Sequence, residues 1–152
     1  MKETDRIVSL FEKLYNGEPW IDVTIQGTLS RISAAQAFNR PIPNCNTIWE
    51  IVNHLIEWKI NVLQRINGQV LVTPANNYIS PILDPSDLAW DQTLNRFESV
   101  HNQWLEYLRK VNTGDFDSHY PPNQMTYYEH ILGILQHEAY HLGQIVILAK
   151  QV

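Results

Sequence analysis

Cysteine, glycine and positive charge are all scarce in this chain. Only one of its 152 residues is cysteine, Cys45, so no disulfide can form within the chain. Small secreted domains commonly depend on several disulfides, and the lack of them favours a reducing compartment. The charged segment 1–6 is followed by no signal-type apolar stretch, and no apolar run is long enough to span a membrane. We therefore expect a cytoplasmic protein with no membrane partner.

Acidic residues outnumber basic ones, which narrows the range of partners. Eleven Lys and Arg stand against sixteen Asp and Glu, giving a formal net charge of −5, and no basic run or basic face occurs along the chain. A protein that follows a phosphate backbone needs such a patch. We therefore expect no nucleic acid partner.

The length fits a single domain covering residues 1–152. A chain of this size buries roughly two-thirds of the surface that its unfolded form would expose, without help from disulfides. No second domain is needed to build a core.

Two capping boxes mark the starts of long helices. In each, a threonine stands three residues before a glutamate and an apolar helical pattern follows, at Thr47 with Glu50 and at Thr126 with Glu129. The first of these helices is predicted to end near residue 67, because Gly68 can adopt the left-handed conformation that ends a helix.

Two further stretches show the spacing of a packed helix. The first is predicted to start at Thr4 and to end at Asn16, and the second runs from Ser86 and closes by Gly114. A weaker pattern in residues 20–32 is also predicted to be helical, although β-branched residues reduce its helix propensity.

Prolines and asparagines interrupt the segments between these helices. Residues 69–85 and 112–125 are predicted to be loops, and no segment has the pattern of a sheet. The sequence therefore predicts an all-α protein, a four-helix bundle with long connecting loops. Loops of this length allow either an up-and-down or a crossover connectivity.

Histidines at helical spacing are the main candidates for chemistry. His137 and His141 lie four residues apart, so about 1.5 Å of rise per residue puts both imidazoles on one face about 6 Å apart. A third ligand must come from another helix, and His54 is the best candidate because its neighbours point to an inward face. His130 lies about 10 Å along the helix from His137, too far to join the same cation.

Three neutral imidazoles with an open coordination position suit zinc, nickel or ferrous iron. Such a divalent cation would supply Lewis-acid chemistry. The spacing of His137 and His141 also arises by coincidence in amphipathic helices. His101 lies on the apolar seam of its helix, where a histidine bonded to a backbone carbonyl is the ordinary state, and His119 is expected to be solvated.

Four residues beside the pair are candidates for supporting roles. Glu138 and Tyr140 are candidate catalytic groups, with a solvated glutamate on the helix face as the alternative for Glu138. His130 and Gln144 share the stripe of the two histidines and are candidates to line a ligand pocket or to orient the metal ligands.

The run His137–His141 also matches H-E-x-x-H, in which Glu138 would be the general base of a metallohydrolase. The extended form of that motif would place glycine and histidine at positions occupied here by Gln144 and Ile147. The eleven residues after His141 contain no acidic ligand, and no sheet is predicted that would hold a peptide substrate. The match is therefore a weak indication of hydrolase activity.

The segments HLIEWK and LGILQHEAYHLGQIVILAK resemble the DinB/YfiT-like superfamily of metalloenzymes, and the similarity extends over most of the chain, including AAQAFNRP. The resemblance implies a four-helix bundle with a divalent metal held by His54, His137 and His141. Members with known chemistry include bacillithiol-type thiol S-transferases and mycothiol-dependent isomerases.

Two functions follow as hypotheses. The first is a metal-dependent enzyme that adds a small thiol to an electrophile, so that both are candidate partners. The second is a non-catalytic bundle that binds a metal or a small ligand and acts as a homodimer. The five tryptophans would belong either to such an interface or simply to the core, and the core is the expectation for most of them.

Overall fold

Side-chain caps set the starts of three long helices. Helix α4 (Ile48–Ile66) begins after Thr47, whose hydroxyl accepts from the Glu50 amide at 3.1 Å while the Glu50 carboxylate accepts from the Thr47 amide at 2.8 Å. The same reciprocal pair, Thr126 with Glu129, opens helix α6 (Tyr127–Ala149). Ser86 caps helix α5 (Asp87–Lys110) through the Ala89 amide. Both predicted capping boxes are therefore present.

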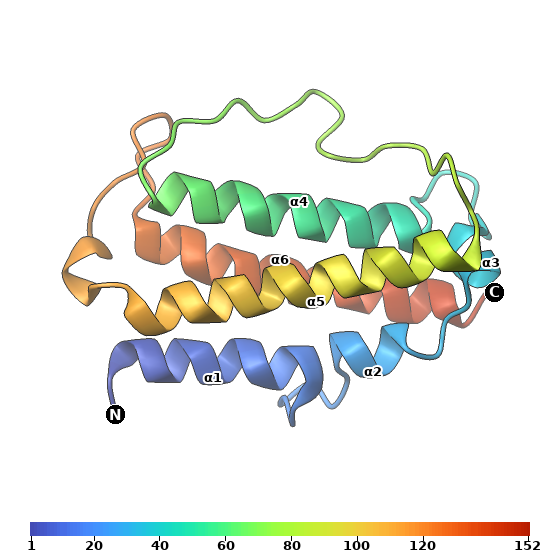
Figure 1. Ribbon diagram of the computed structural model, residues 1–152, viewed down its shortest axis with the longest axis horizontal. Helices are drawn as coiled ribbons and strands as arrows, with labels where there is room; N and C mark the ends of the chain where they lie inside the picture. The colour runs from blue at the N-terminus through green and yellow to red at the C-terminus, as the bar shows by residue number, and fades with distance from the viewer.

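Four long helices lie side by side in the computed structural model, which describes residues 1–152 (Figure 1). Helix α1 (Glu3–Asn16) packs on α5, and α4 packs on both α5 and α6. The remaining elements are short: α2 (Ile25–Leu29), α3 (Ala34–Phe38) and the 3-10 turn η1 (Thr113–Asp115). No strand is formed beyond an isolated bridge between His119 and Thr126. The all-α prediction is confirmed.

The connection between α4 and α5 is a crossover. In Figure 1 both helices run in the same direction, and residues 67–86 return along the whole length of α4 before α5 begins. Helices α1 and α6 run the opposite way, through connections that turn back at the ends of the helices. The structure thus selects the crossover connectivity from the two that the loop lengths allow.

Three local predictions were wrong. Helix α1 begins at Glu3, so Thr4 lies inside the helix, where its side chain is buried, and is not the cap. Within residues 20–32 only α2 is helical, because Asp22 has a left-handed backbone (φ 62°) and Thr24 caps a new start. Helix α3, capped by Ser33, was not predicted. Helices of five residues, such as α2 and α3, have few apolar repeats, which explains the second and third errors.

The core between the long helices is apolar except at its centre. Aromatic side chains such as Phe11, Phe97 and Trp104 are at most 1% exposed. Among them lies Lys59, which is fully buried and contacts the Glu138 carboxylate at 2.6 Å. No helix is long and apolar enough to cross a bilayer.

Candidate metal site

Three histidines from two helices converge on one point. His54 of α4 meets His137 and His141 of α6, with candidate ligand nitrogens that all lie within 4.8 Å of one another. The Nε2 atoms of His54 and His137 are 2.9 Å apart. The ring centroids of the three imidazoles are separated by 4.6–4.9 Å. The structure therefore brings together the three residues that the sequence singled out.

Hydrogen bonds orient two of these rings. The Nδ1–H of His54 donates to the backbone carbonyl of Asn77 at 2.7 Å, and the Nδ1–H of His141 donates to the Gln144 side-chain oxygen at 2.6 Å. A carbonyl or amide oxygen can only accept, so each of these two rings carries its proton on Nδ1 and has its lone pair on Nε2. Metal-binding histidines are commonly fixed in this way. The donor set fits a divalent cation of the zinc type.

Burial keeps the three imidazoles neutral. It lowers the pKa of His137 to about 3, with the neighbouring His141 and His54 adding to the effect. Burial also lowers the pKa of His54 and of His141, although the hydrogen bonds to Asn77 and Gln144 oppose the shift. Neutral imidazole is the form that ligates a metal, so the group needs to lose no proton at neutral pH.

The crossover loop supplies a residue that sequence reasoning missed. Asn77 and Tyr78 are consecutive residues with positive φ, 53° and 60°. The Asn77 side chain accepts from the indole N–H of Trp58 at 3.0 Å, and the Tyr78 hydroxyl accepts from Asn61 at 2.7 Å. These bonds hold the Asn77 carbonyl over His54. Asparagine tolerates a left-handed backbone and tyrosine does so rarely, which indicates local strain beside the site.

Gln144 and Tyr140 lie on the solvent side of His141. The Gln144 amide donates to the Tyr140 hydroxyl at 3.1 Å while its oxygen accepts from His141. The Tyr140 ring lies edge-on to the His141 ring and its side chain is 65% exposed. Gln144 therefore orients a candidate ligand, and Tyr140 holds Gln144 in place.

The solvated position considered for Glu138 is wrong. Its side chain is 1% exposed, and its carboxylate is paired with Lys59 in the core and lies outside the group of converging ligand atoms. Burial raises the pKa of Glu138 and lowers that of Lys59, and the contact between them opposes both shifts. A carboxylate held on Lys59 is poorly placed as the general base of an H-E-x-x-H hydrolase.

The other two inward histidines lie outside the group. His130 packs against the edge of Tyr120 near the start of α6, and burial lowers its pKa. His101 contacts Lys59 through Nδ1 at 3.2 Å and stacks on Tyr15, so its partner is a side chain and not the backbone carbonyl that we expected. His119 is exposed in its loop, as predicted.

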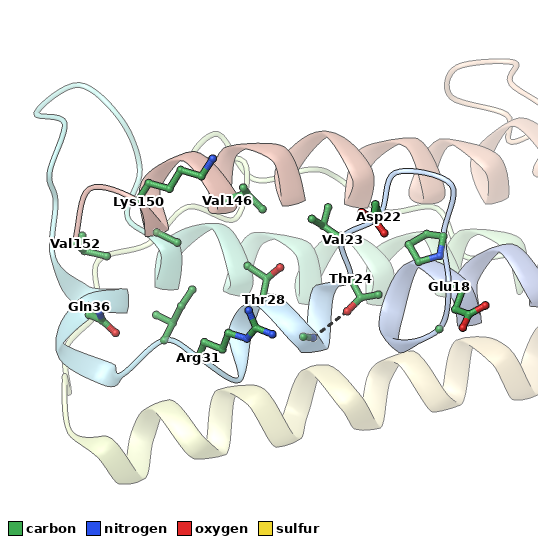
Figure 2. A pocket seen from close by; sticks show the side chains of 15 residues that line it. Glu18, Asp22, Val23, Thr24, Thr28, Arg31, Gln36, Val146, Lys150 and Val152 are labelled. Atoms are coloured by element: carbon green, nitrogen blue, oxygen red, sulfur yellow. Dashed lines mark hydrogen bonds between the residues drawn. The ribbon is translucent and has the colours of Figure 1, made fainter.

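The largest recess in the molecule lies away from the histidines. Its volume is about 740 Å³, and Figure 2 shows it between α2, the segment before it and the last turns of α6. Charged side chains of both signs line it, among them Glu18, Asp22, Arg31 and Lys150. None of the three converging histidines contributes to its wall, so the recess is separate from the candidate metal site.

Comparison with known proteins identifies the family. Residues 24–145 match the model of the DinB superfamily, a span that includes all three converging histidines. Neither the curated proteins nor the solved structures gave a significant match. The match covers well over half of the 152 residues, and the all-helical fold agrees with it. The chain belongs to the DinB superfamily.

Proposed function

We propose that this protein is a metal-dependent enzyme that adds a small thiol to an electrophilic compound. The observation that carries the proposal is the convergence of His54, His137 and His141, in which His54 and His141 have their lone pairs on Nε2 because Nδ1 of each ring is hydrogen-bonded. Thiol transfer is the chemistry of family members such as the bacillithiol-type transferases. Zinc, nickel or ferrous iron held by these residues would act as a Lewis acid that lowers the pKa of a thiol.

The chain's own residues would fix the ligands and limit access. Asn77 and Gln144 hold two imidazoles in the tautomer that binds a cation, so neither of these two rings needs to change its protonated nitrogen when the cation enters. Trp58 lies edge-on to His137 and, with Tyr78, forms an aromatic wall on the side of the crossover loop. This wall reduces the access of water from that side.

A comparison of single variants tests the proposal. Purified protein is loaded with zinc, nickel or ferrous iron and screened for conjugation of small thiols to electrophiles, alongside His54→Ala and His137→Ala. Both variants are expected to lose metal and conjugation, with an affinity loss above about a hundredfold, since removing even a group that only supports a ligand costs ten- to a hundredfold. His119→Ala, which changes an exposed histidine, is the matched control. Equal conjugation rates in all four proteins would contradict the proposal.

We also propose that the protein forms a homodimer. Trp20 is 98% exposed, and Ile21 and Val23 beside it are partly exposed, so this segment presents an apolar surface. Light scattering of the protein and of Trp20→Ser tests this proposal. A dimer that Trp20→Ser converts to a monomer is expected, and a monomeric parent protein would contradict it.

A further inference from the structure

A second, smaller recess lies next to Gln144, the hydrogen-bond partner of His141, and none of the three histidines lines it. Its volume is about 320 Å³, and it opens between α4, α6 and the segment that precedes α4. Its apolar wall is formed by Ile42, Ile51, Ile147 and Leu148, together with Cys45. The amides of Asn44, Asn46 and Gln144 complete the lining. No charged side chain contributes to it, in contrast to the larger recess.

Gln144 belongs to both the recess and the candidate metal site. Its side-chain oxygen accepts from His141, and the same residue lines the recess. On α4, Ile51 is three residues before His54, which corresponds to about 4.5 Å along the helix. Ile147 is six residues after His141, or about 9 Å. These spacings put the recess about 4.5–9 Å along the two helices from the histidines, on the side of His141 that Gln144 occupies.

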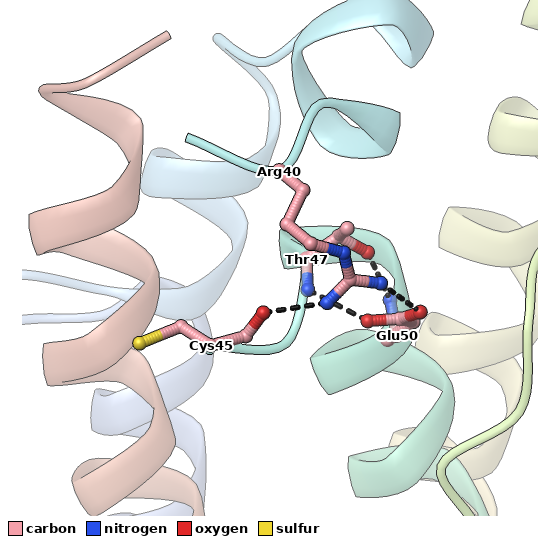
Figure 3. Close-up of polar contacts among 4 residues, drawn as sticks. All are labelled: Arg40, Cys45, Thr47 and Glu50. Atoms are coloured by element: carbon pink, nitrogen blue, oxygen red, sulfur yellow. Dashed lines mark hydrogen bonds and ion pairs between the residues drawn. The ribbon is translucent and has the colours of Figure 1, made fainter. Parts of the chain in front are cut away.

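The wall formed by the segment before α4 is held by side chains and does not need a ligand to form. Arg40 donates to the Cys45 carbonyl at 2.5 Å and to the Glu50 carboxylate at 2.7 Å (Figure 3). Glu50 is also the capping partner of Thr47, so the first turn of α4 and the wall are fixed by one network. Figure 3 shows the Cys45 side chain directed toward α6.

We propose that this recess binds the uncharged apolar part of the substrate whose reactive end lies at the three histidines. Apolar walls with a few amides are typical of small-molecule sites, and the volume is near the lower end of their range. The lack of charge favours a neutral group, because a charged one would lose its hydration without gaining a partner. This substrate class, a small electrophile with a compact apolar group, rests on the proposed function.

Hydroxamates with tails of different length test the proposal on zinc-loaded protein. Acetohydroxamate carries the metal-binding head alone, and hexanohydroxamate adds four methylenes. Each methylene that enters the recess should tighten binding about fourfold, so hexanohydroxamate is expected to bind on the order of a hundredfold more tightly. Ile147→Glu should remove most of this gain and leave acetohydroxamate binding unchanged. Leu10→Glu, at a similarly exposed apolar residue on α1, should keep the gain.

Methyl NMR of the metal-free protein separates this proposal from the proposed function. Hexanamide, which has the tail without the chelating head, should shift the methyl signals of Ile51 and Leu148 and leave those of Ile7 in place. Blocking the only cysteine, Cys45, with benzyl methanethiosulfonate should abolish these shifts, and dithiothreitol should restore them.

The outcomes are distinct. If acetohydroxamate bound the parent and His54→Ala with equal affinity, the proposed metal site would be overturned. Shifts of the Ile51 and Leu148 methyl signals by hexanamide would still support the recess. The proposal for the recess alone would be overturned if acetohydroxamate binding depended on His54 but hexanohydroxamate bound less than about threefold more tightly than acetohydroxamate. The same conclusion would follow if hexanamide shifted no methyl signals. If hexanohydroxamate kept its tighter binding in Ile147→Glu, the proposal for the recess would also be overturned, because the tail would then lie elsewhere.

Discussion

At the scale of single residues, two of the three imidazoles, those of His54 and His141, are oriented by the oxygen that accepts from Nδ1. The Asn77 carbonyl and the Gln144 side-chain oxygen each accept from an Nδ1–H, which directs Nε2 of His54 and His141 inward. The spacing of His137 and His141 on one helix was visible in the sequence. The hydrogen bond from His54 to Asn77 joins residues 23 positions apart, across a loop whose course no local pattern fixes.

Removing the Gln144 oxygen should weaken metal binding without unfolding the protein. In Gln144→Leu the His141 ring loses the acceptor that fixes its tautomer, and we expect zinc affinity to fall by about ten- to a hundredfold. Isothermal titration with zinc measures the loss. Gln136→Leu, at an exposed position on the same helix, is the control and should bind zinc like the parent. An unchanged affinity in Gln144→Leu would show that this hydrogen bond does not support the site.

At the scale of helices, a buried ion pair ties α4 to α6 next to the histidines. Lys59 follows His54 by five residues and Glu138 follows His137 directly, so the pair and the metal ligands share the same two helices. A buried pair of this kind is weak support for stability, because desolvation opposes the attraction. Its loss on one side only is costly, since the remaining charge has no partner.

Single and double variants of this pair should therefore differ. Lys59→Met leaves Glu138 buried without its cation and should lower the free energy of unfolding by about 3–5 kcal/mol. Lys59→Met combined with Glu138→Leu removes both charges, and most of the stability should return. Urea unfolding of the metal-free proteins measures both values. A double variant as unstable as the single one would mean that the pair itself, and not the uncompensated charge, determines the loss.

At the scale of the whole molecule, buried histidines make stability depend on pH. Burial lowers the pKa of His101 to about 3, with the nearby cations of Lys59 and Arg109 adding to the effect. Below the ordinary pKa of about 6.5, the unfolded chain binds a proton at this residue that the folded protein does not. The contribution of His101 to the free energy of unfolding is therefore fully present above about pH 6.5. It is lost as the pH falls from there toward about 3.

The size of this effect can be isolated with one substitution. Between pH 7 and pH 5, His101 alone should cost about 2 kcal/mol of stability. His101→Gln keeps an uncharged acceptor near Lys59 and cannot take up the proton, so its urea midpoint should fall less on going from pH 7 to pH 5. Metal-free protein is used for both. Parallel losses in parent and variant would place the acid sensitivity at other groups, such as the three converging histidines.

The starts of α4 and α6 could be predicted from the sequence, because the capping boxes at Thr47 and Thr126 and the apolar spacing after them are local features. The sequence also indicated which histidines to examine, since helical periodicity fixes the face that His137 and His141 share. The sequence did not predict the boundaries of α2 and α3, because segments of five residues contain too few apolar repeats to show a period.

The partners that these helix faces contact could not be predicted from the sequence and follow from the three-dimensional packing. The crossover of residues 67–86 brings Asn77 onto His54, and the packing of α4 against α6 turns Glu138 toward Lys59 rather than toward solvent. The first outcome depends on the course of the loop, and the second depends on how α4 is rotated against α6. That rotation is set by the summed packing of many side chains distant in the chain, which no local pattern of residues contains.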